Sequence, residues 1–192
     1  MSEGQNPSEV SFEPFCAWFT GPPASGKSTL GERLAERLRR SGARIEILDG
    51  DALRSTISSD LGFTKDDRDE QVRRVTDLAA AVMSSGASAI VALVSPYRVA
   101  RNEARARLVR FCEIHVTCPF DELVRRDPKD LYRRALAGEV RHVTGVDDPY
   151  EPPLSCEATI DTSIMDVDEA VTFILDRLIA LGLLAAQRSV LD

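Results

Sequence analysis

Apolar residues recur along the chain in five short runs that are rich in β-branched and aromatic side chains. Between these runs lie longer stretches in which apolar positions repeat every three or four residues, the spacing of one helix face. This alternation of strands and helices predicts an α/β fold, with a mostly parallel sheet flanked by helices on both faces. The expected strands cover residues 15–20, 45–48, 89–94, 111–117 and 158–160.

Four amphipathic helices are expected between and after these strands. In the first, Leu30, Leu34 and Leu38 follow one another at four-residue spacing, and Ser41-Gly42 supplies a stop signal. The last carries an apolar stripe that indicates core packing. The predicted helices cover residues 27–40, 68–83, 99–109 and 167–179.

The third of these helices is strongly basic, and little apolar surface interrupts its charges. Charged residues on a helix are usually solvated, and Glu103 can form only one of the neighbouring helix pairs. We therefore expect most of its arginines to form a solvated face. They are Arg101, Arg105, Arg107 and Arg110.

Residues 128–153 are the least core-like part of the chain. After Pro128 they contain three further prolines, two glycines, many charges and few large apolar residues. An irregular segment of this length inside a compact domain is usually functional or disordered, and the strand that must follow favours function. We expect a mobile lid here.

The length of 192 residues, with 43% hydrophobic residues, fits one globular domain over residues 12–192. Residues 1–11 carry acidic side chains and no apolar core, which predicts a disordered lead-in rather than a signal peptide. The net charge of -7 argues against a general nucleic-acid binder, because such proteins usually have excess Lys and Arg. An anionic substrate must then be held by a local basic cluster.

Residues 78–97 contain no charged side chain, but Ser84-Ser85-Gly86 interrupts the apolar character. A helix end, a turn and a buried strand explain this stretch better than a membrane span. The four cysteines form no C-x-x-C pair, and Cys16 and Cys112 lie inside apolar runs. We expect reduced thiols and a cytoplasmic location, with a redox switch left open as an alternative.

A phosphate-binding motif follows the first strand. Glycines at both ends of G-x-x-x-x-G-K-S let the backbone fold around a polyphosphate, with its N–H groups and a helix N-terminus directed inward. Lys27 can reach the β- and γ-phosphates, and the Ser28 hydroxyl is placed to ligate Mg²⁺. The alternative is a Gly/Pro turn with an exposed lysine. The expected nucleotide-binding residues are Gly21, Ala24, Ser25, Gly26, Lys27, Ser28 and Thr29.

Two carboxylates, Asp49 and Asp51, follow the second strand directly. Because parallel strands end at the same sheet edge, both should face the phosphate-binding loop. A carboxylate there can orient Mg²⁺ through water, or accept a hydrogen bond and a proton from an attacking hydroxyl. The alternative is that Asp51 only caps a helix beginning at Ala52.

An aromatic ring and several guanidinium groups lie close together in residues 61–74, where Phe63 precedes Arg68 and Arg73-Arg74. Arginine suits phosphate or sulfate because its two parallel N–H donors match two oxygens. A charged helix start explains the same pattern, so both interpretations stay open.

The motifs taken together, in matching order, closely resemble the adenylylsulfate kinase family. The resemblance runs from about Phe12 to the C-terminus, and several blocks are distinctive on their own. It implies a three-layer P-loop NTPase-type fold with a mobile lid. The matching blocks are residues 21–29, 49–51 with Arg54, 60–63, 67–68, 73–74, 95–98, 126–129, 131–132, 144–145 and 148–151.

The resemblance implies transfer of the ATP γ-phosphoryl group to the 3′-hydroxyl of adenosine 5′-phosphosulfate, with Mg²⁺ as cofactor. Lys27 and the metal would offset charge on the transferring group, and Asp51 would position the hydroxyl. Lys129 matches a lysine that reaches the reacting phosphates from the lid. Without the resemblance, a solvated surface lysine would be the better interpretation of Lys129.

The resemblance also implies an acceptor site. Arg54 and Arg68 would hold the phosphosulfate, and Phe63 matches a phenylalanine that stacks on the substrate adenine. Ser95 matches an acceptor-site serine after the third strand, although an ordinary turn serine would otherwise be expected. Gln71 occupies a position where the family usually has an asparagine that contacts substrate, and its longer amide can still serve in that role.

The lid also departs from the family pattern. Val143 stands where a phenylalanine usually completes an aromatic clamp, and Asp130 replaces a usual glycine. Base stacking on an aromatic residue contributes about 1–3 kcal/mol in nucleic-acid binders. We therefore expect weaker acceptor binding unless His142 turns inward, with phosphoryl transfer itself less affected.

Three other functions stay open beside the kinase: a related small-molecule kinase with another hydroxyl acceptor, a nucleotide-gated switch protein, and a catalytically impaired regulatory subunit. The switch would leave the acceptor-site residues without a role. The expected partners are ATP and adenosine 5′-phosphosulfate, with neither nucleic acid nor membrane. The resemblance adds a homodimer as the oligomeric state to be tested.

Overall fold

A computed structural model describes residues 13–185, so the predicted lead-in over residues 1–11 lies outside the described residues. Its five strands form one parallel sheet in the order β2-β3-β1-β4-β5. The predicted α/β fold is confirmed, and each predicted strand is present with its ends shifted by two residues at most. The strands are β1 (Cys16–Thr20), β2 (Ile45–Asp49), β3 (Ser88–Ala92), β4 (Phe111–Thr117) and β5 (Ala158–Asp161).

The four predicted helices are also present. The first has the predicted bounds, whereas the second begins three residues early because Thr64 and Asp67 form a capping box ahead of it. Three short helices were not among the four predicted, since five to seven residues are too few to show a helical period; the sequence indicates a helix near α2 only in the alternative in which Asp51 caps it. The helices are α1 (Lys27–Arg40), α2 (Gly50–Arg54), α3 (Lys65–Ser84), α4 (Arg98–Arg107), α5 (Phe120–Arg126), α6 (Leu131–Leu136) and α7 (Val167–Ala180).

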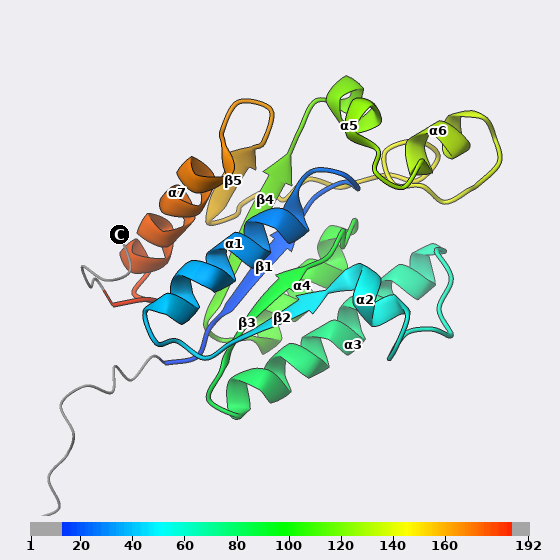
Figure 1. Ribbon diagram of the computed structural model, residues 1–192. Coiled ribbons are helices and arrows are strands. Elements are labelled where there is room, and N and C mark those ends of the chain that lie inside the picture. Colours follow the sequence, from blue (N-terminus) through cyan, green and yellow to red (C-terminus); the bar gives the residue numbers. More distant parts are fainter. Residues whose placement is uncertain (1–12, 186–192) are drawn as a thin grey trace, which may run out of the picture.

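The sheet separates two apolar cores. On one face, α1 and α7 cover a cluster that includes Phe19 and Ile114, and on the other, α3 and α4 cover a cluster around Trp18 (Figure 1). Successive residues of β1 contribute to opposite clusters, as side-chain alternation along a strand requires. Since both faces are covered, all five residues of β1 are buried.

The strand order places the functional loops together. Strand β1 lies between β3 and β4. The chain leaves β1 toward β2 on one side and leaves β3 toward β4 on the other, so these two connections run in opposite directions across the sheet. In open parallel sheets such a switch point, at the carboxyl ends of the strands, is the usual ligand site. The loops after β1, β2 and β3 all emerge at this edge, beside α5 and α6 (Figure 1).

The segment predicted as a lid has more internal structure than expected. It contains α6 and a small apolar cluster in which Tyr132 and Val143 pack against Cys118 and Leu123. Val143 is buried there, at 4% exposure. Two of the few large apolar residues of this segment thus pack in a small core, while mobility of the segment stays a prediction.

The expectation of a solvated arginine face on α4 was wrong for Arg101. Arg101 is only 1% exposed and pairs with Glu113 on β4, whereas Arg107 lies at the surface. Ala100 and Ala104 of the same helix are buried, so the helix packs closely on the sheet and takes Arg101 inward.

The uncharged stretch over residues 78–97 forms the end of α3, a turn and β3, as predicted. Over residues 13–185, no helix combines the length and apolar character that crossing a bilayer needs.

Candidate active site

The loop after β1 has the geometry that its glycines predict. A Cβ atom on Gly21 would lie 2.1 Å from the carbonyl oxygen of Val116, so only glycine fits there. Gly26, with a φ of 96°, is the N-cap residue that precedes α1; it provides no side-chain cap, and the first turn of α1 carries no acidic residue. The positive end of the α1 dipole therefore has no protein anion in its first turn to offset it, which favours a bound phosphate.

Lys27 points back into this loop. Its Nζ donates to the carbonyl oxygen of Pro22 at 2.7 Å and to Ser25 Oγ at 3.4 Å, and the residue is 8% exposed. The alternative of an exposed turn lysine is therefore wrong. Burial lowers the pKa of Lys27 to about 8, while Asp51 and Asp49 act in the opposite direction.

Ser28 and Asp49 form a pair of oxygen donors at the mouth of the loop. The Ser28 hydroxyl donates to Asp49 Oδ2 at 2.6 Å, and Asp49 Oδ1 accepts from the amides of Asp51 and Ala52. Asp49, and not Asp51, is therefore the cap of α2, so the capping alternative for Asp51 is wrong. Hydroxyl and carboxylate oxygens are suitable ligands for Mg²⁺.

The described part of the chain has no cluster of three or more His, Cys, Asp or Glu suited to a metal. Mg²⁺ at kinase sites usually takes one or two protein ligands together with substrate phosphates and waters. The Ser28 and Asp49 pair fits this use.

Asp51 faces the lid. Its side chain is largely exposed and forms an ion pair with Lys129, which lies 78 residues away in sequence. The lid lysine and the carboxylate after β2 thus meet beside the phosphate-binding loop. The resemblance placed both near the reacting groups, and the structure brings them together.

Side chains distant in sequence hold the back of the phosphate-binding loop. The Tyr132 hydroxyl on α6 donates to the carbonyl oxygen of Pro23 at 3.0 Å. The Thr162 hydroxyl, just after β5, donates to the carbonyl oxygen of Ser25 at 2.9 Å, and Arg126 in turn donates to Thr162. Sequence reasoning assigned these three residues no role in positioning the loop, because nothing local marks a side chain that bonds to a loop more than a hundred residues earlier.

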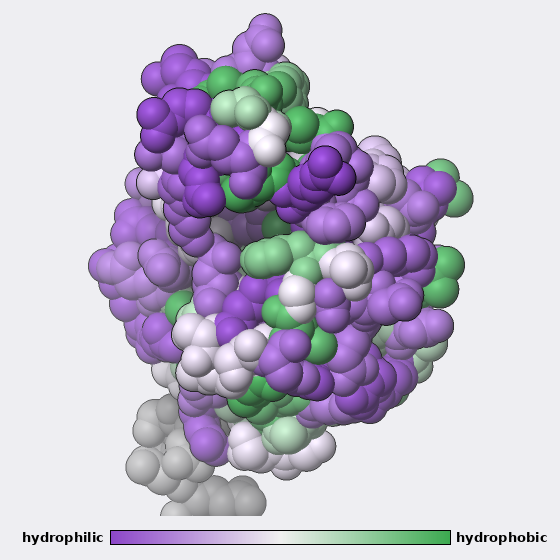
Figure 2. Space-filling model, turned by 90° about the vertical axis from the view of Figure 1, so that its right-hand side faces the viewer, coloured by the Kyte–Doolittle hydropathy of each residue, from purple (hydrophilic) through white to green (hydrophobic). Residues whose placement is uncertain are grey.

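A small cavity of about 20 Å³ lies beyond the end of β3. It brings together four of the residues expected to bind the acceptor, and three others complete its lining. One face of the molecule is hollowed, and both hydrophilic and hydrophobic residues border the depression (Figure 2). The cavity is lined by Arg54, Arg68, Gln71, Val72, Leu93, Ser95 and Pro96.

Gln71 stands out in this cavity. It is 1% exposed, and neither its Nε2 nor its Oε1 has a hydrogen-bond partner in the protein. A buried amide without partners costs about 1–3 kcal/mol, so such a group commonly marks a place where another molecule bonds.

Phe63 lies at the surface, 53% exposed, with two guanidinium groups beside its ring. The Cζ of Arg54 lies 4.4 Å from the ring centroid, and that of Arg68 lies 5.7 Å from it. This ring has an open area on which a planar group can stack, and neighbouring cations suit an anionic one.

Arg68 is more constrained than the sequence suggested. It donates to the carbonyl oxygens of Phe63 and His142 and forms an ion pair with Asp148 at 3.1 Å. Burial lowers the pKa of Arg68, and Asp148 opposes that shift. Its guanidinium therefore joins the start of α3 to the lid.

The neighbouring arginines of α3 bind protein carboxylates. Arg74 forms a two-pronged pair with Asp60, and both Arg73 and Arg74 bond to Glu70. These bonds lower the pKa of Glu70 to about 2. Of the three closely spaced guanidinium groups, only that of Arg68 lines the acceptor cavity.

Ser95 has a φ of 39°, a value that is rare for residues other than glycine. Its hydroxyl accepts from Trp18 Nε1 at 3.1 Å and donates to Thr20 Oγ1 at 3.0 Å. The side chain is thus already bonded on the sheet side, and a direct contact with substrate stays a prediction.

Comparison with known proteins gives a consistent result. A family model described as adenylylsulphate kinase matches residues 13–161. The adenylyl-sulfate kinase of Picosynechococcus is 43% identical over 165 residues, which are 86% of this chain and 93% of that protein. A probable bifunctional SAT/APS kinase of Sorangium cellulosum is 44% identical over 88% of this chain, which spans only 29% of that longer protein.

A solved structure agrees in fold as well as sequence. The APS kinase of Mycobacterium tuberculosis, in complex with AMPPNP and APS, superposes with a TM-score of 0.84 at 34% identity. The match covers 87% of this chain and 98% of that one.

Proposed function

The chain belongs to the adenylylsulphate kinase family, and on this premise we propose how its own residues move the ATP γ-phosphoryl group to the 3′-hydroxyl of adenosine 5′-phosphosulfate. The reaction yields 3′-phosphoadenosine 5′-phosphosulfate and ADP. Lys27 and the loop over residues 21–29 bind the triphosphate, while Asp51 and Lys129 act at the transferring group.

One observation carries this proposal: Asp51 pairs with Lys129 and also interacts electrostatically with Lys27 of the phosphate-binding loop and Arg54 of the acceptor cavity. A carboxylate there can accept a hydrogen bond from an incoming ribose hydroxyl and take its proton as the new P–O bond forms. Lys129 is released from Asp51 when the hydroxyl takes its place, and its ammonium can then offset charge on the phosphoryl oxygens.

Lys27 supplies a second positive charge beside that of Lys129, from within the phosphate-binding loop. Its ammonium is held by the Pro22 carbonyl oxygen, so it can turn toward a β- or γ-phosphate with little rearrangement. In a buried site such a charge stabilises the transition state more than it would in water.

Mg²⁺ would be held by Ser28 and Asp49, directly or through water, together with the phosphates of ATP. When bound, the ion neutralises negative charge on the β- and γ-phosphates. Both oxygens already lie 2.6 Å apart at the mouth of the loop. The side chains therefore need little movement to receive the ion.

The acceptor would lie in the hollow lined by Arg54, Arg68 and Gln71, with its adenine against Phe63. Gln71 offers an amide NH2 group, with two donors, and a carbonyl oxygen that no protein group uses. Val143, which stands at the usual clamp position, is instead buried in the lid cluster. The adenine would therefore have a single aromatic face, which supports weaker acceptor binding.

We also infer a single catalytic domain over residues 12–192 with a mobile lid over residues 128–153, a homodimer and a cytoplasmic location. Light scattering coupled to size exclusion would decide the oligomeric state, with a mass twice the 21.1 kDa of one chain as the expected result. A monomeric mass at assay concentration would contradict the dimer.

The direct test of the reaction is incubation with ATP, Mg²⁺ and adenosine 5′-phosphosulfate, followed by mass spectrometry of the nucleotides. We expect the 3′-phosphorylated product, its loss when EDTA removes Mg²⁺, and little product with gluconate or shikimate as acceptors. Transfer to one of these other hydroxyls alone would replace the proposed acceptor.

The role of Asp51 has its own prediction. Asp51→Asn keeps the size of the side chain and removes its basicity, so we expect kcat to fall at least about 100-fold, the lower range for general-base catalysis. Asp66→Asn, an exposed change in the first turn of α3, should leave kcat within twofold. If the two variants behave alike, Asp51 does not handle the hydroxyl proton.

A further inference from the structure

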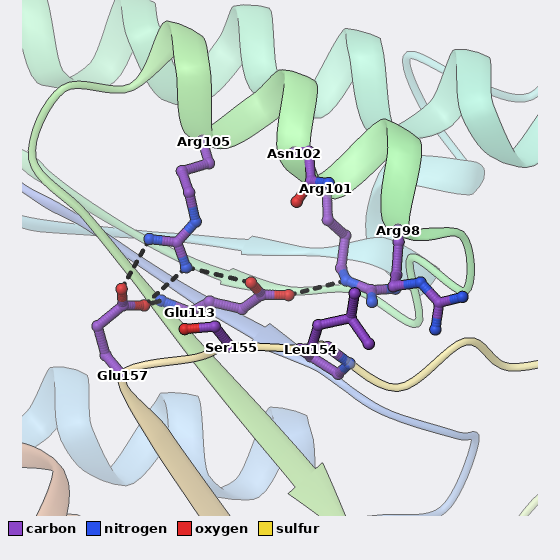
Figure 3. A pocket seen from close by; sticks show the side chains of 9 residues that line it. Arg98, Arg101, Asn102, Arg105, Glu113, Leu154, Ser155 and Glu157 are labelled. Atoms are coloured by element: carbon purple, nitrogen blue, oxygen red, sulfur yellow. Dashed lines mark hydrogen bonds and ion pairs between the residues drawn. The ribbon is translucent and has the colours of Figure 1, made fainter.

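Arg101 on α4 bonds to three separate parts of the protein at once. Its Nη1 donates to the carbonyl oxygen of Ser95 at 2.6 Å and its Nη2 to that of Glu151 at 2.6 Å. Its Nε donates to Glu113 Oε1 at 2.8 Å, in the middle of β4 (Figure 3). Each nitrogen of the guanidinium group therefore bonds to a different segment.

Two of these segments belong to the acceptor side of the proposed active site. Ser95 lines the small cavity beside Gln71 and has the rare positive φ. Glu151 lies near the C-terminal end of the lid, three residues after Asp148, whose carboxylate pairs with Arg68. A side chain that holds both carbonyl oxygens fixes how far the end of the lid lies from the cavity wall.

Other bonds join the same two segments, so they form one junction. The Glu151 amide donates to the Pro96 carbonyl oxygen at 2.8 Å, and the Arg98 amide donates to Glu151 Oε2 at 2.9 Å. The Tyr97 hydroxyl donates to Asp148 Oδ1 at 2.9 Å. Arg101 contacts both sides of this junction through the carbonyl oxygens of Ser95 and Glu151.

Charge balance alone does not require an arginine at this position. Glu113 also pairs with Arg105 at 3.1 Å, and Arg105 in turn bonds to Glu157 (Figure 3). A buried ion pair is weak evidence for stability, because apolar residues of similar volume often serve as well. What only arginine provides is a rigid planar fork that reaches two carbonyl oxygens and a carboxylate together.

A cavity beside the junction makes it sensitive to the loss of the Arg101 guanidinium group. A cavity of about 280 Å³ opens beside the network, between α4 and the segment that follows the lid (Figure 3). Leu154, which lines it, is 89% exposed. The side chain of Leu154 therefore adds little packing to the segment after Glu151, which Arg101 holds through the Glu151 carbonyl oxygen and Arg98 through that of Pro152.

We propose that Arg101 is a positioning residue for the acceptor, which sets the distance between the Ser95 wall of the acceptor cavity and the C-terminal end of the lid. It touches neither ATP nor the reacting atoms. The proposal rests on the proposed function for its kinetic readout, but its structural readout is independent of that function.

The experiment compares Arg101→Lys with Arg105→Lys, a matched control one turn along the same helix and bonded to the same Glu113. Lysine keeps the charge but cannot reach all three acceptors. We expect Arg101→Lys to raise KM for adenosine 5′-phosphosulfate at least tenfold with KM for ATP within twofold. Arg105→Lys should leave both within twofold.

Hydrogen exchange gives the second readout. The amides of Arg98 and Glu151 report directly on the junction, and we expect both to exchange at least tenfold faster in Arg101→Lys and unchanged in Arg105→Lys. The double variant R101M/E113Q removes both buried charges, so it should fold and show the same rise in acceptor KM.

The outcomes separate this inference from the proposed function. If the wild-type protein does not phosphorylate adenosine 5′-phosphosulfate, the proposed function fails, and amide exchange still tests whether Arg101 holds the junction. Equal exchange in the two lysine variants overturns that role. Faster exchange with an unchanged acceptor KM overturns the link to the acceptor, as does an equal rise in both KM values.

Discussion

Burial gives single polar side chains in this site properties that their residue types do not have in water. Lys27 has a pKa near 8 because the loop and α1 remove it from solvent, although two aspartates oppose the shift. Gln71 lies buried with no protein partner for either amide atom. In both cases the fold carries a free-energy cost that a ligand can offset.

The cost at Lys27 can be measured as a pH dependence of stability. Its pKa is lower in the folded protein than the usual 10.5, so folding disfavours the charged form below about pH 8 and the penalty disappears as the pH rises past 10.5. We expect Lys27→Met to abolish phosphoryl transfer and to raise the free energy of unfolding at pH 7 by up to about 3 kcal/mol. Urea unfolding at pH 7, 9 and 10.5 would check that this gain shrinks with pH.

A Lys27→Met protein that is less stable than wild type at every pH would contradict the prediction. It would mean that the bond to the Pro22 carbonyl oxygen outweighs the cost of burying the charge.

A substitution at Gln71 can likewise be tested for its separate effects on stability and on acceptor binding. Gln71→Leu removes two unpaired polar atoms at nearly constant volume, so we expect the free energy of unfolding to stay equal or rise by about 1 kcal/mol. The same change should raise KM for adenosine 5′-phosphosulfate about tenfold, since one or two bonds to the acceptor are lost. Denaturant unfolding and steady-state kinetics on one preparation would measure both effects.

Gln71→Asn is the matched control for the length of this amide. If the longer side chain has replaced the usual asparagine in contacting the acceptor, the asparagine variant should lie between wild type and Gln71→Leu in acceptor KM. An acceptor KM that is unchanged in both variants would rule out contact between Gln71 and the acceptor.

At the scale of elements, the helices differ in how their N-terminal N–H groups are capped. Helices α3 and α7 begin with capping boxes and carry acidic residues in their first turns. Helix α1, whose N-cap residue is Gly26, has neither a capping box nor an acidic residue in its first turn. The first N–H groups of α1 are thus kept for a phosphate, and α1 depends on packing of Leu30, Leu34 and Leu38 for its stability.

The loop before α1 depends in turn on α6. Tyr132 is fully buried, and its hydroxyl bonds to the Pro23 carbonyl oxygen. We expect Tyr132→Phe to keep the fold but loosen this loop, raising KM for ATP about fivefold, the equivalent of about 1 kcal/mol for one hydrogen bond. Phe120→Leu, which changes the ring beside Tyr132 and keeps the hydroxyl bond, is the control and should leave KM for ATP within twofold.

Isothermal titration with a nonhydrolysable ATP analogue would give the same comparison without turnover. An unchanged affinity in Tyr132→Phe would show that α6 does not position the loop.

At the scale of the whole molecule, the sheet keeps its thiols out of reach. Cys16 and Cys112 are buried on neighbouring strands, and burial raises the pKa of both, that of Cys112 to about 12. Cys118 is 8% exposed, and Cys156 is partly exposed. All four are free thiols in the structure, and the reduced state of the protein stays a prediction.

This arrangement predicts a simple result with a thiol reagent such as DTNB. The native protein should show one fast-reacting thiol, Cys156, and the denatured protein all four. Cys156→Ser should remove the fast phase and leave activity unchanged under oxidising conditions. Activity that is lost on oxidation and restored by a thiol would instead support the redox switch.

Three features of the protein could be derived from local sequence: the strand and helix alternation, the phosphate-binding loop and the family resemblance that its motifs carry. Each depends on short spacings, such as the four-residue repeat of leucines in α1 or Gly26-Lys27-Ser28 after an apolar strand. The bonding geometry of the backbone fixes what such spacings mean. That information is complete before the chain folds.

Only the tertiary structure decided which charges are buried and what they bond. Arg101 and Arg107 look alike in sequence, yet one is enclosed and the other lies at the surface. The one sequence signal was Glu113, a charge within an apolar strand that needed a partner. Pairs such as Asp51 with Lys129 depend on how the sheet brings distant loops to one edge, and no spacing along the chain encodes that distance.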